Sequence, residues 1–341
     1  MTIRLGPAAP IIPGAMTAPA IHVDELTKVY KVTEREAGVA ASLRSLVRRR
    51  TEEVRAVDGI SFDLAPGEVV GFLGPNGAGK TTTLKMLSGL LHPTSGTATV
   101  LGFTPARRER DFLRQITLVM GQRNQLVWDI PAIDSFELNR AVYRLPPADY
   151  QRTLKELTEL LDLGPLLKKP VRNLSLGERM KCEIAAALLH RPQMVFLDEP
   201  TIGLDVTMQR RIRAFFADYN QRFGATVLLT SHYMNDVEAL CKRVIVIHEG
   251  KLLFDGDLAA LLQRFSSHKT IVVQLETCPD HLEGYGEVVS CEDGLVTLRV
   301  PKAETPCTTA RLLADLPVID LTVEDPPIEE VIERVFAQEP E

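Results

Sequence analysis

The chain has 341 residues, 45% of them hydrophobic, and its formal net charge is −6. That length is typical of about two domains, and the acidic balance gives no indication of bulk nucleic-acid binding. No apolar run reaches the roughly 18 residues that a membrane-spanning helix needs. The five cysteines are scattered without a C-x-x-C pair, so we expect neither disulfides nor a zinc site.

The predicted elements begin after a tail. Residues 1–20 are rich in Ala and Pro, and we expect a disordered tail there, because prolines interrupt the apolar run that a signal peptide needs. A helix is predicted to follow the glycine-rich stretch 74–81 and to end near Pro93. Strands are predicted from alternating or continuous apolar residues at 21–32, 61–64, 69–73, 97–102 and 115–120.

Helical periodicity dominates residues 123–190, where apolar residues recur every three or four positions, and we expect a helical subdomain there. Apolar strands return at 193–199, 225–232 and 243–250, separated by helices such as 206–223. Strands that are apolar throughout and alternate with helices indicate a parallel sheet covered on both faces. We therefore expect an α/β core over residues 21–265.

The remaining residues, 266–341, are predicted to form a small α+β accessory domain. A strand is expected at 269–276 and a hairpin at 286–300, turning at residues 292–294. Helices at 308–316 and 328–338 are expected to flank a further strand at 318–323.

The stretch GPNGAGKT carries the strongest motif, because it matches G-x-x-x-x-G-K-[ST] between a strand and a helix. Glycines allow the backbone to curl so that several N–H groups point at one anion, and the following helix adds the positive end of its dipole. Lys80 can reach the β- and γ-phosphates, and the Thr81 hydroxyl can ligate Mg²⁺. The predicted nucleotide-binding residues are Gly74, Pro75, Asn76, Gly77, Ala78, Gly79, Lys80, Thr81 and Thr82.

Two carboxylates follow the apolar strand of QMVFLDEP. Ligands bind at the carboxyl ends of strands in open α/β sheets, so Asp198 can bind Mg²⁺ and Glu199 can orient an attacking water. A strand that merely ends at an acidic turn is the alternative, and the nearby phosphate loop argues against it.

A third motif opens the helix of NLSLGERMKCEIAAALLH. The Ser175 side chain and the N–H groups near Gly177 form a second anion site, although this stretch alone would also suit an ordinary helix start.

Together these motifs resemble the ATPase subunit of ATP-binding cassette (ABC) transporters, most closely the type-2 exporter group. The resemblance covers residues 21 to about 260 and includes six motifs in the family's order. They are the phosphate loop, the glutamine loop at Gln122, the signature from Leu174 to Glu178, the pair Asp198 and Glu199, the D-loop ending at Asp205, and the switch histidine His232. The resemblance implies a mostly parallel sheet with a small antiparallel β subdomain and an inserted helical subdomain.

The resemblance also implies a role for each residue around ATP. Tyr30 would stack on adenine, although a strand aromatic packed in the core would look the same in the sequence. Lys80 would neutralise the phosphates, and Glu199 would be the general base. His232 would help to position the attacking water. The residues that would hold Mg²⁺ or its waters are Thr81, Gln122 and Asp198; Gln122 competes with Gln125 as the loop glutamine, and we favour Gln122 because it directly follows the strand.

Other residues would act across a dimer, according to the same resemblance. Ser175, Gly177 and Glu178 would contact the ATP held by another subunit, and Asp205 would lie at the dimer contact. The signature reads LSLGE in place of L-S-G-G-Q, so a negative charge enters an anion site. The Glu178 contact therefore depends on a neighbouring cation, for which Arg179 and Lys181 are the candidates.

A second departure from the family is an insertion at about residues 33–55. Val39, Leu43, Leu46 and Val47 fall on one helical face, beside Arg44, Arg48, Arg49 and Arg50. A basic amphipathic helix can lie on anionic lipid or dock a partner, and a solvated surface helix is the alternative.

The function implied is that of the ATP-hydrolysing subunit of an exporter, working with separate permease subunits and with a second copy of itself or a paralogue. Such a subunit would sit at the cytoplasmic face of a bacterial membrane. Trp128 lies in the stretch where this family meets its permease, and it is either an anchor of that interface or a packed residue. An importer subunit and a soluble ABC ATPase are the alternatives. A P-loop kinase or GTPase fits less well, because no N-K-x-D motif appears beside the later strands, and no nucleic-acid partner is expected.

Overall fold

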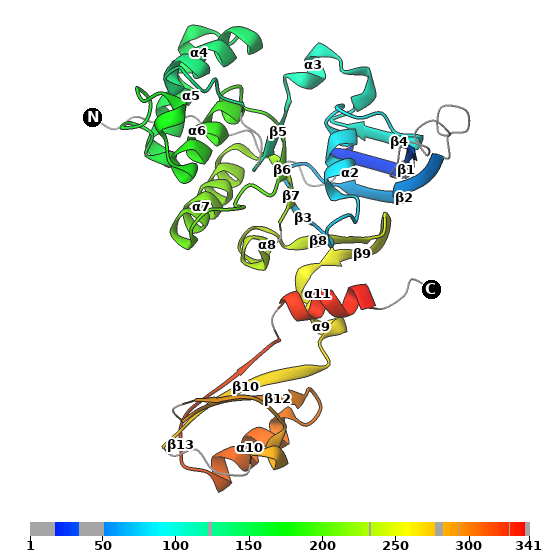
Figure 1. Cartoon of the computed structure of the whole chain (residues 1–341), viewed down its shortest axis with the longest axis vertical. Coiled ribbons are helices and arrows are strands. Elements are labelled where there is room, and N and C mark those ends of the chain that lie inside the picture. Colours follow the sequence, from blue (N-terminus) through cyan, green and yellow to red (C-terminus); the bar gives the residue numbers. More distant parts are fainter. Residues whose placement is uncertain are drawn as a thin grey trace, which may run out of the picture.

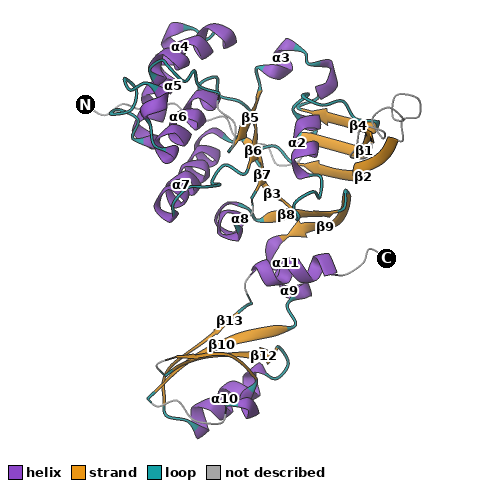
Figure 2. Ribbon diagram, in the orientation of Figure 1, coloured by secondary structure: helices purple, strands orange, loops and turns teal. Residues whose placement is uncertain are grey.

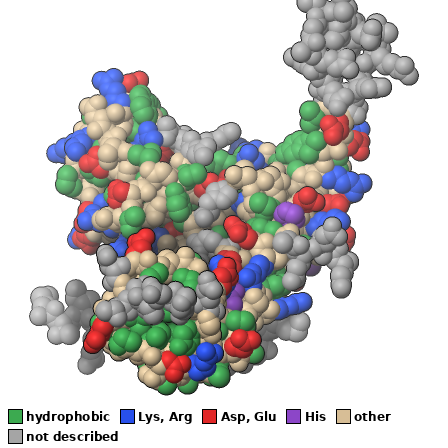
Figure 3. Space-filling model, turned by 60° about the horizontal axis from the view of Figure 1, so that its bottom comes forward, with side chains coloured by type: hydrophobic (Ala, Val, Ile, Leu, Met, Phe, Trp, Pro, Cys, Tyr) green, Lys and Arg blue, Asp and Glu red, His purple; other side chains and the backbone are tan. Residues whose placement is uncertain are grey.

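The computed structural model describes residues 18–33, 51–121, 125–231, 233–276, 282–292, 294–326 and 328–337. A large α/β unit stands at one end of the molecule, and a smaller sheet with one helix stands at the other (Figure 1). Hydrophobic, acidic and basic side chains are interspersed over the face that Figure 3 shows. Within the described residues, no helix is long and apolar enough to cross a membrane.

A six-stranded sheet forms the centre of the large unit. Its strands lie in the order β5-β6-β7-β3-β8-β9, and all pair in parallel except β9 with β8. Their bounds are β5 (Ile116–Met120), β6 (Met194–Asp198), β7 (Thr226–Thr230), β3 (Val69–Leu73), β8 (Arg243–His248) and β9 (Lys251–Asp257). Every residue of β7 is buried, as expected for a parallel sheet covered on both faces.

Successive residues of these strands enter different cores. Leu228 packs in the core beneath α2 (Lys80–Leu87) and the antiparallel sheet, whereas Leu229 packs in the core with α6 (Leu176–Leu188) and α7 (Val206–Phe223). Phe196 and Leu197 divide in the same way, because side chains alternate across a strand. The sheet therefore separates two hydrophobic layers. Figure 2 shows α6 and α7 on one side of it and α2 with the antiparallel strands on the other.

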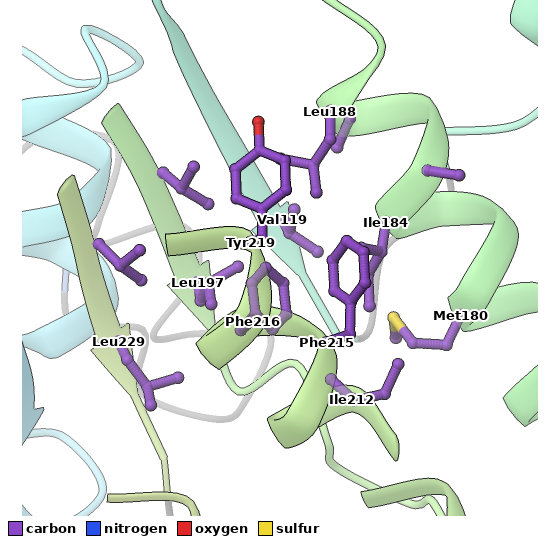
Figure 4. Close-up of a cluster of buried hydrophobic side chains, with 14 of the residues drawn as sticks. Val119, Met180, Ile184, Leu188, Leu197, Ile212, Phe215, Phe216, Tyr219 and Leu229 are labelled. Atoms are coloured by element: carbon purple, nitrogen blue, oxygen red, sulfur yellow. The ribbon is translucent and has the colours of Figure 1, made fainter. Parts of the chain in front are cut away.

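Three helices form the helical subdomain: α4 (Ala132–Tyr143), α5 (Pro147–Leu161) and α6 (Leu176–Leu188). The α6 helix packs against α7 (Val206–Phe223), which covers the sheet, and Met180, Ile184 and Leu188 repeat at the interval that places them on one side of α6 (Figure 4). Two short helices, α3 (Arg110–Leu113) and α8 (Met234–Leu240), connect strands of the large unit.

A small antiparallel sheet has the order β2-β1-β4, with β1 (Ile21–Thr33), β2 (Thr51–Leu64) and β4 (Ser95–Val100). Pairing of β1 with β2 runs from Ile21 opposite Leu64 to Thr33 opposite Thr51. Residues 51–55 of the expected insertion therefore form part of a strand, and the expected basic helix, residues 34–50, lies outside the described residues. Residues 1–17 also lie outside them, and the buried Ala20 donates its N–H to the Leu64 carbonyl.

The carboxyl-terminal sheet has the order β11-β12-β10-β13 and an apolar cluster of its own. Its elements are β10 (His268–Leu275), β11 (Glu287–Glu292), β12 (Leu295–Pro301), α10 (Thr305–Asp315) and β13 (Val318–Glu324). The last helix, α11 (Ile328–Ala337), leaves this sheet and returns to α9 (Leu258–Phe265) of the large unit. Ile328, Ile332 and Val335 are buried in the core of the large unit.

The fold class predicted from the sequence is confirmed: a mostly parallel sheet, a small antiparallel sheet, a helical insertion and a small α+β unit all occur. One expectation is wrong. Cys291 on β11 is disulfide-bonded, although the scattered cysteines gave no indication of a disulfide.

Candidate active site

The phosphate loop lies between β3 and α2 and depends on its glycines. A Cβ atom at Gly74 would lie 2.4 Å from the Ile247 carbonyl oxygen, and one at Gly79 would lie 2.3 Å from the Ala56 carbonyl oxygen. Gly79 also has a φ of 103°, a value that side chains disfavour. Among the described residues no side chain caps α2, so the N–H groups of its first turn can bind an anion.

Lys80 is held inside this loop. Its side chain is 5% exposed, and its ammonium donates to the carbonyl oxygens of Gly74 at 2.6 Å and Pro75 at 3.0 Å. Burial lowers the pKa of Lys80, while the nearby carboxylates of Glu199 and Asp198 act in the opposite direction. A phosphate would give this ammonium a charged partner, which neutral carbonyls cannot do.

Oxygen atoms from three elements meet beside the loop. The Thr81 hydroxyl donates to Asp198 at 2.9 Å from Oδ2 and 3.1 Å from Oδ1, and the Thr230 hydroxyl donates to Oδ1 at 2.9 Å. A carboxylate and a hydroxyl suit Mg²⁺, which usually binds one or two carboxylates together with substrate phosphates. The described residues contain no cluster of three or more His, Cys, Asp or Glu side chains, so such an ion would need phosphate or water oxygens as well.

Glu199 occupies an unusual backbone position at the end of β6. Its φ is 53°, and its N–H lies 3.1 Å from the carbonyl oxygen of Thr230 and 3.2 Å from its hydroxyl. A Cβ atom at Gly121 would lie 2.1 Å from the Glu199 carbonyl oxygen. Gly121 thus lets the end of β5 pass directly against Glu199. Gly121 is also the residue immediately before Gln122 in the sequence.

Two expected residues, Gln122 and His232, lie outside the described residues. The rival glutamine, Gln125, donates its side-chain N–H to the Leu118 carbonyl oxygen at 2.9 Å. Its backbone N–H donates to Glu183 of α6 at 2.8 Å. Glu183 is 4% exposed, and burial raises the pKa of its carboxyl group. Through its bond with Gln125, this buried side chain ties the loop after β5 to α6, the helix that carries the signature.

The signature serine caps α6 in a capping box. The Ser175 hydroxyl accepts from the Glu178 N–H at 3.2 Å, and the Glu178 carboxylate accepts from the Ser175 N–H at 2.9 Å. The latter bond lowers the pKa of Glu178 most, and Lys169 lies 3.4 Å from the same carboxylate. The cation that offsets Glu178 is therefore Lys169, rather than the expected Arg179 or Lys181.

The D-loop aspartate lies at the start of the neighbouring helix. Asp205 caps α7 by accepting from the Met208 N–H at 2.9 Å. A Cβ atom at Gly177 would lie 3.0 Å from the methyl carbon of Met208, so the amino-terminal turns of α6 and α7 touch. Ser175 and Asp205 are both exposed.

Tyr30 and Trp128, both singled out from the sequence, have accessible rings. Tyr30 on β1 is 37% exposed, which places its ring outside the core, and the Lys28 ammonium lies 5.3 Å from the ring centre. Trp128 is 45% exposed, with the Arg179 guanidinium 5.4 Å from its ring.

Sequence reasoning missed a buried network next to the site. Asp236 of α8 is 1% exposed and accepts from the Ser231 hydroxyl at 2.8 Å, the Arg213 guanidinium at 2.7 Å and the Thr201 hydroxyl. Ser231 directly precedes His232, and Thr201 follows Glu199 by two residues. No motif marks Asp236, because its three partners come from separate elements.

A glycine loop at the end of β3, an uncapped helix after it, and Asp198 and Glu199 at the end of nearby β6 define a P-loop nucleotide-binding protein. Residues 57–202 match the family model described as ABC transporter, and residues 267–324 match the one described as EvrA-like ABC transporter, C-terminal domain.

Curated relatives agree with these matches. The chain is 35% identical to the ABC transporter ATP-binding protein NatA of Bacillus subtilis over 210 residues, covering 62% of this chain and 85% of NatA. It is 34% identical to the Nod factor export ATP-binding protein I of Ralstonia nicotianae over 263 residues, covering 76% of this chain and 75% of that protein. The chain belongs to the family of ABC transporter ATP-binding proteins.

A solved structure shares the fold. The dimeric post-hydrolysis structure of the ATP-binding cassette MJ0796 with ADP and Pi matches 70% of this chain and 98% of its own, with a TM-score of 0.58 and 23% identity.

Proposed function

We propose that this chain binds and hydrolyses ATP to power a transporter. One observation carries the proposal: Lys80, Thr81, Asp198 and Glu199 converge at the carboxyl ends of β3 and β6, beside the uncapped first turn of α2. The loop backbone and the Lys80 ammonium would bind the phosphates. Tyr30, exposed on β1, would stack on the adenine.

The chemistry follows from the same residues. Thr81, Asp198 and Gln122 would hold Mg²⁺ or its waters, and the bound ion would offset charge on the phosphates. Glu199 would accept the proton of the attacking water, and His232 would help to position that water. Glu199 lines a recess of about 10 Å³ with Thr201, Ser231 and Tyr233, which is room for about one water.

Two copies, or one copy and a paralogue, would enclose ATP between them. The exposed Ser175 and Asp205 and the half-buried Gly177 and Glu178 lie at the adjoining starts of α6 and α7, and this surface would meet the nucleotide of the partner. The Ser175 hydroxyl can donate to a phosphate while it accepts from the Glu178 N–H.

Ser175→Arg tests this arrangement. We expect ATP turnover to fall by about 100-fold or more, because a bulky charge would occupy the position of a phosphate contact. ATP binding to the isolated chain should change little, since the phosphate loop is intact; fluorescence titration with a labelled ATP measures it.

Ser175→Ala is the matched control for the lost helix cap. It should lower stability by about 1 kcal/mol but reduce turnover less than the arginine variant. Weakened ATP binding to the isolated Ser175→Arg chain would show that Ser175 serves its own nucleotide site instead.

The proposed transport direction is export. Relatives named for Nod factor export and for linearmycin resistance support this direction. The chain would act at the cytoplasmic face of a bacterial membrane with separate permease subunits, near the exposed Trp128. Co-expression with membrane proteins encoded by adjacent genes tests the predicted association with a permease. A permease should co-purify with the chain, and its absence from detergent extracts would favour a soluble ABC ATPase. An importer remains the second candidate, and transport assays in vesicles separate the two directions.

The basic segment of the insertion is proposed to face the membrane or the permease. Changing Arg44, Arg48, Arg49 and Arg50 to glutamine should lower binding to anionic vesicles or to permease membranes, because each basic side chain near a charged surface contributes about 1 kcal/mol. ATPase activity in solution should be unchanged. Sedimentation with vesicles measures recruitment, and equal recruitment of the variant would leave the segment as a solvated surface.

A further inference from the structure

A cavity of about 500 Å³ lies between α5, α6 and α7, apart from the phosphate loop. Half of its lining residues are apolar, namely Leu160, Leu161, Ile212, Ala214 and Phe215, and the other half are charged. Its volume is in the range typical of small-molecule sites.

The charged side chains that line this cavity are not balanced. Arg222 pairs with Asp218 at 2.7 Å, and Arg211 lies 3.9 Å from Asp162. Lys181 of α6 also lines the cavity but is only 6% exposed, and it makes no ion pair or hydrogen bond with any described residue. The lining therefore carries one unbalanced positive charge, that of Lys181, whose stem is buried while its ammonium is not among the fully buried atoms.

We propose that this cavity binds a small amphiphilic anion. An anion in the cavity would give the Lys181 ammonium the charge-assisted hydrogen bond that no described residue supplies. The apolar walls fit an aliphatic or aromatic body attached to that anion. A carboxylate and a phosphate monoester share this chemistry.

The cavity is placed to act on both helix caps. Lys181 lies two turns after the cap Ser175 on α6, and Arg211 lies two turns after the cap Asp205 on α7. A ligand between the helices holds their amino-terminal turns together. This last step rests on the proposed function, because only a closed dimer uses both caps.

Calorimetric titration of the full chain tests the binding itself. The probes are octanoate, octyl phosphate and neutral octanol, added with saturating ADP so that the phosphate loop is blocked. We expect at least one of the two anions to bind with one site per chain. Octanol should bind at least about 10-fold more weakly than that anion, because it cannot form the charge-assisted bond. The stronger of the two anions identifies the headgroup.

Lys181 variants supply the decisive comparison. Lys181→Met keeps the aliphatic stem and should weaken anion binding by about 10-fold, whereas Lys181→Arg should retain it. Lys155→Met, an exposed lysine on α5, is the matched control and should bind like the unchanged chain. The melting temperature of Lys181→Met without ligand should be unchanged, because the stem is kept and no ion pair with a described residue is lost.

Several results overturn the proposal. They are an absence of saturable binding by both anions, equal binding of octanol, and unchanged anion binding by Lys181→Met. Should Lys181→Met fail to fold, Lys181→Gln replaces it, and anion binding by that variant has the same meaning. These titrations measure anion binding and not ATP hydrolysis. A negative result in either the titrations or the ATPase assays would therefore contradict one proposal and leave the other standing.

Discussion

Glu199→Gln is expected to bind ATP and to hydrolyse it about 100-fold or more slowly. An amide cannot accept the proton of the attacking water, and a positioned general base typically contributes 10²- to 10⁴-fold. The change keeps the shape of the side chain, so the strained backbone at φ 53° and the bonds from its N–H to Thr230 should persist. ATP should then remain bound and hold two chains together.

Two measurements check this expectation. Phosphate release gives the turnover, and light scattering with and without ATP gives the particle mass, which should double only with ATP. Glu238→Gln, an exposed carboxylate on α8, is the matched control and should behave like the unchanged chain. Normal turnover in Glu199→Gln would remove Glu199 as the base, and a constant single-chain mass would count against the shared ATP site.

Asp236→Ala is expected to lower the free energy of unfolding by about 3–5 kcal/mol. The change leaves the Arg213 guanidinium, 13% exposed, without its partner and the Thr201 hydroxyl without its acceptor. The Ser231 hydroxyl keeps only its longer bond to the Tyr233 carbonyl oxygen, at 3.2 Å. Because Ser231 precedes His232 and Thr201 lies near Glu199, ATP turnover should fall as well. Urea unfolding and steady-state hydrolysis measure the two effects.

Controls separate the buried charge from a general effect of losing an ion pair. Asp149→Ala removes the exposed partner of Arg152 and should cost no more than about 1 kcal/mol. Changing Arg213 to Met together with Asp236 to Leu removes both charges, so it should recover much of the stability but not the turnover. A cost below 1 kcal/mol for Asp236→Ala would show that the network is not structurally important.

Local patterns predicted the central sheet and the phosphate loop well. The strands at 116–120, 194–198 and 226–230 are short, mostly apolar runs, and the loop glycines have a fixed spacing, so both signals are contained in a few neighbouring residues. Contacts between residues far apart in the sequence could not be predicted from such local patterns. Lys169 neutralises Glu178 from a different segment, whereas Arg179 and Lys181 are neighbours in sequence that point elsewhere on the helix.

The last helix shows the same limit. The sequence predicted a helix at 328–338 as part of the small domain, but periodicity does not identify what a helix packs against. Ile328, Ile332 and Val335 of this helix are buried in the core of the large unit. The sequence order suggested the neighbouring small sheet, and the structure places the helix against the large unit.

The return of α11 has a practical consequence for shortening this protein. The small sheet is anchored to the large unit by α9 before it and by α11 after it, where the His248 and Phe336 rings stack at 5.5 Å. A truncation after residue 265 would strip a hydrophobic cover from the large unit and favour aggregation. Excising residues 268–325 and bridging the gap with a flexible linker would instead leave the cover in place.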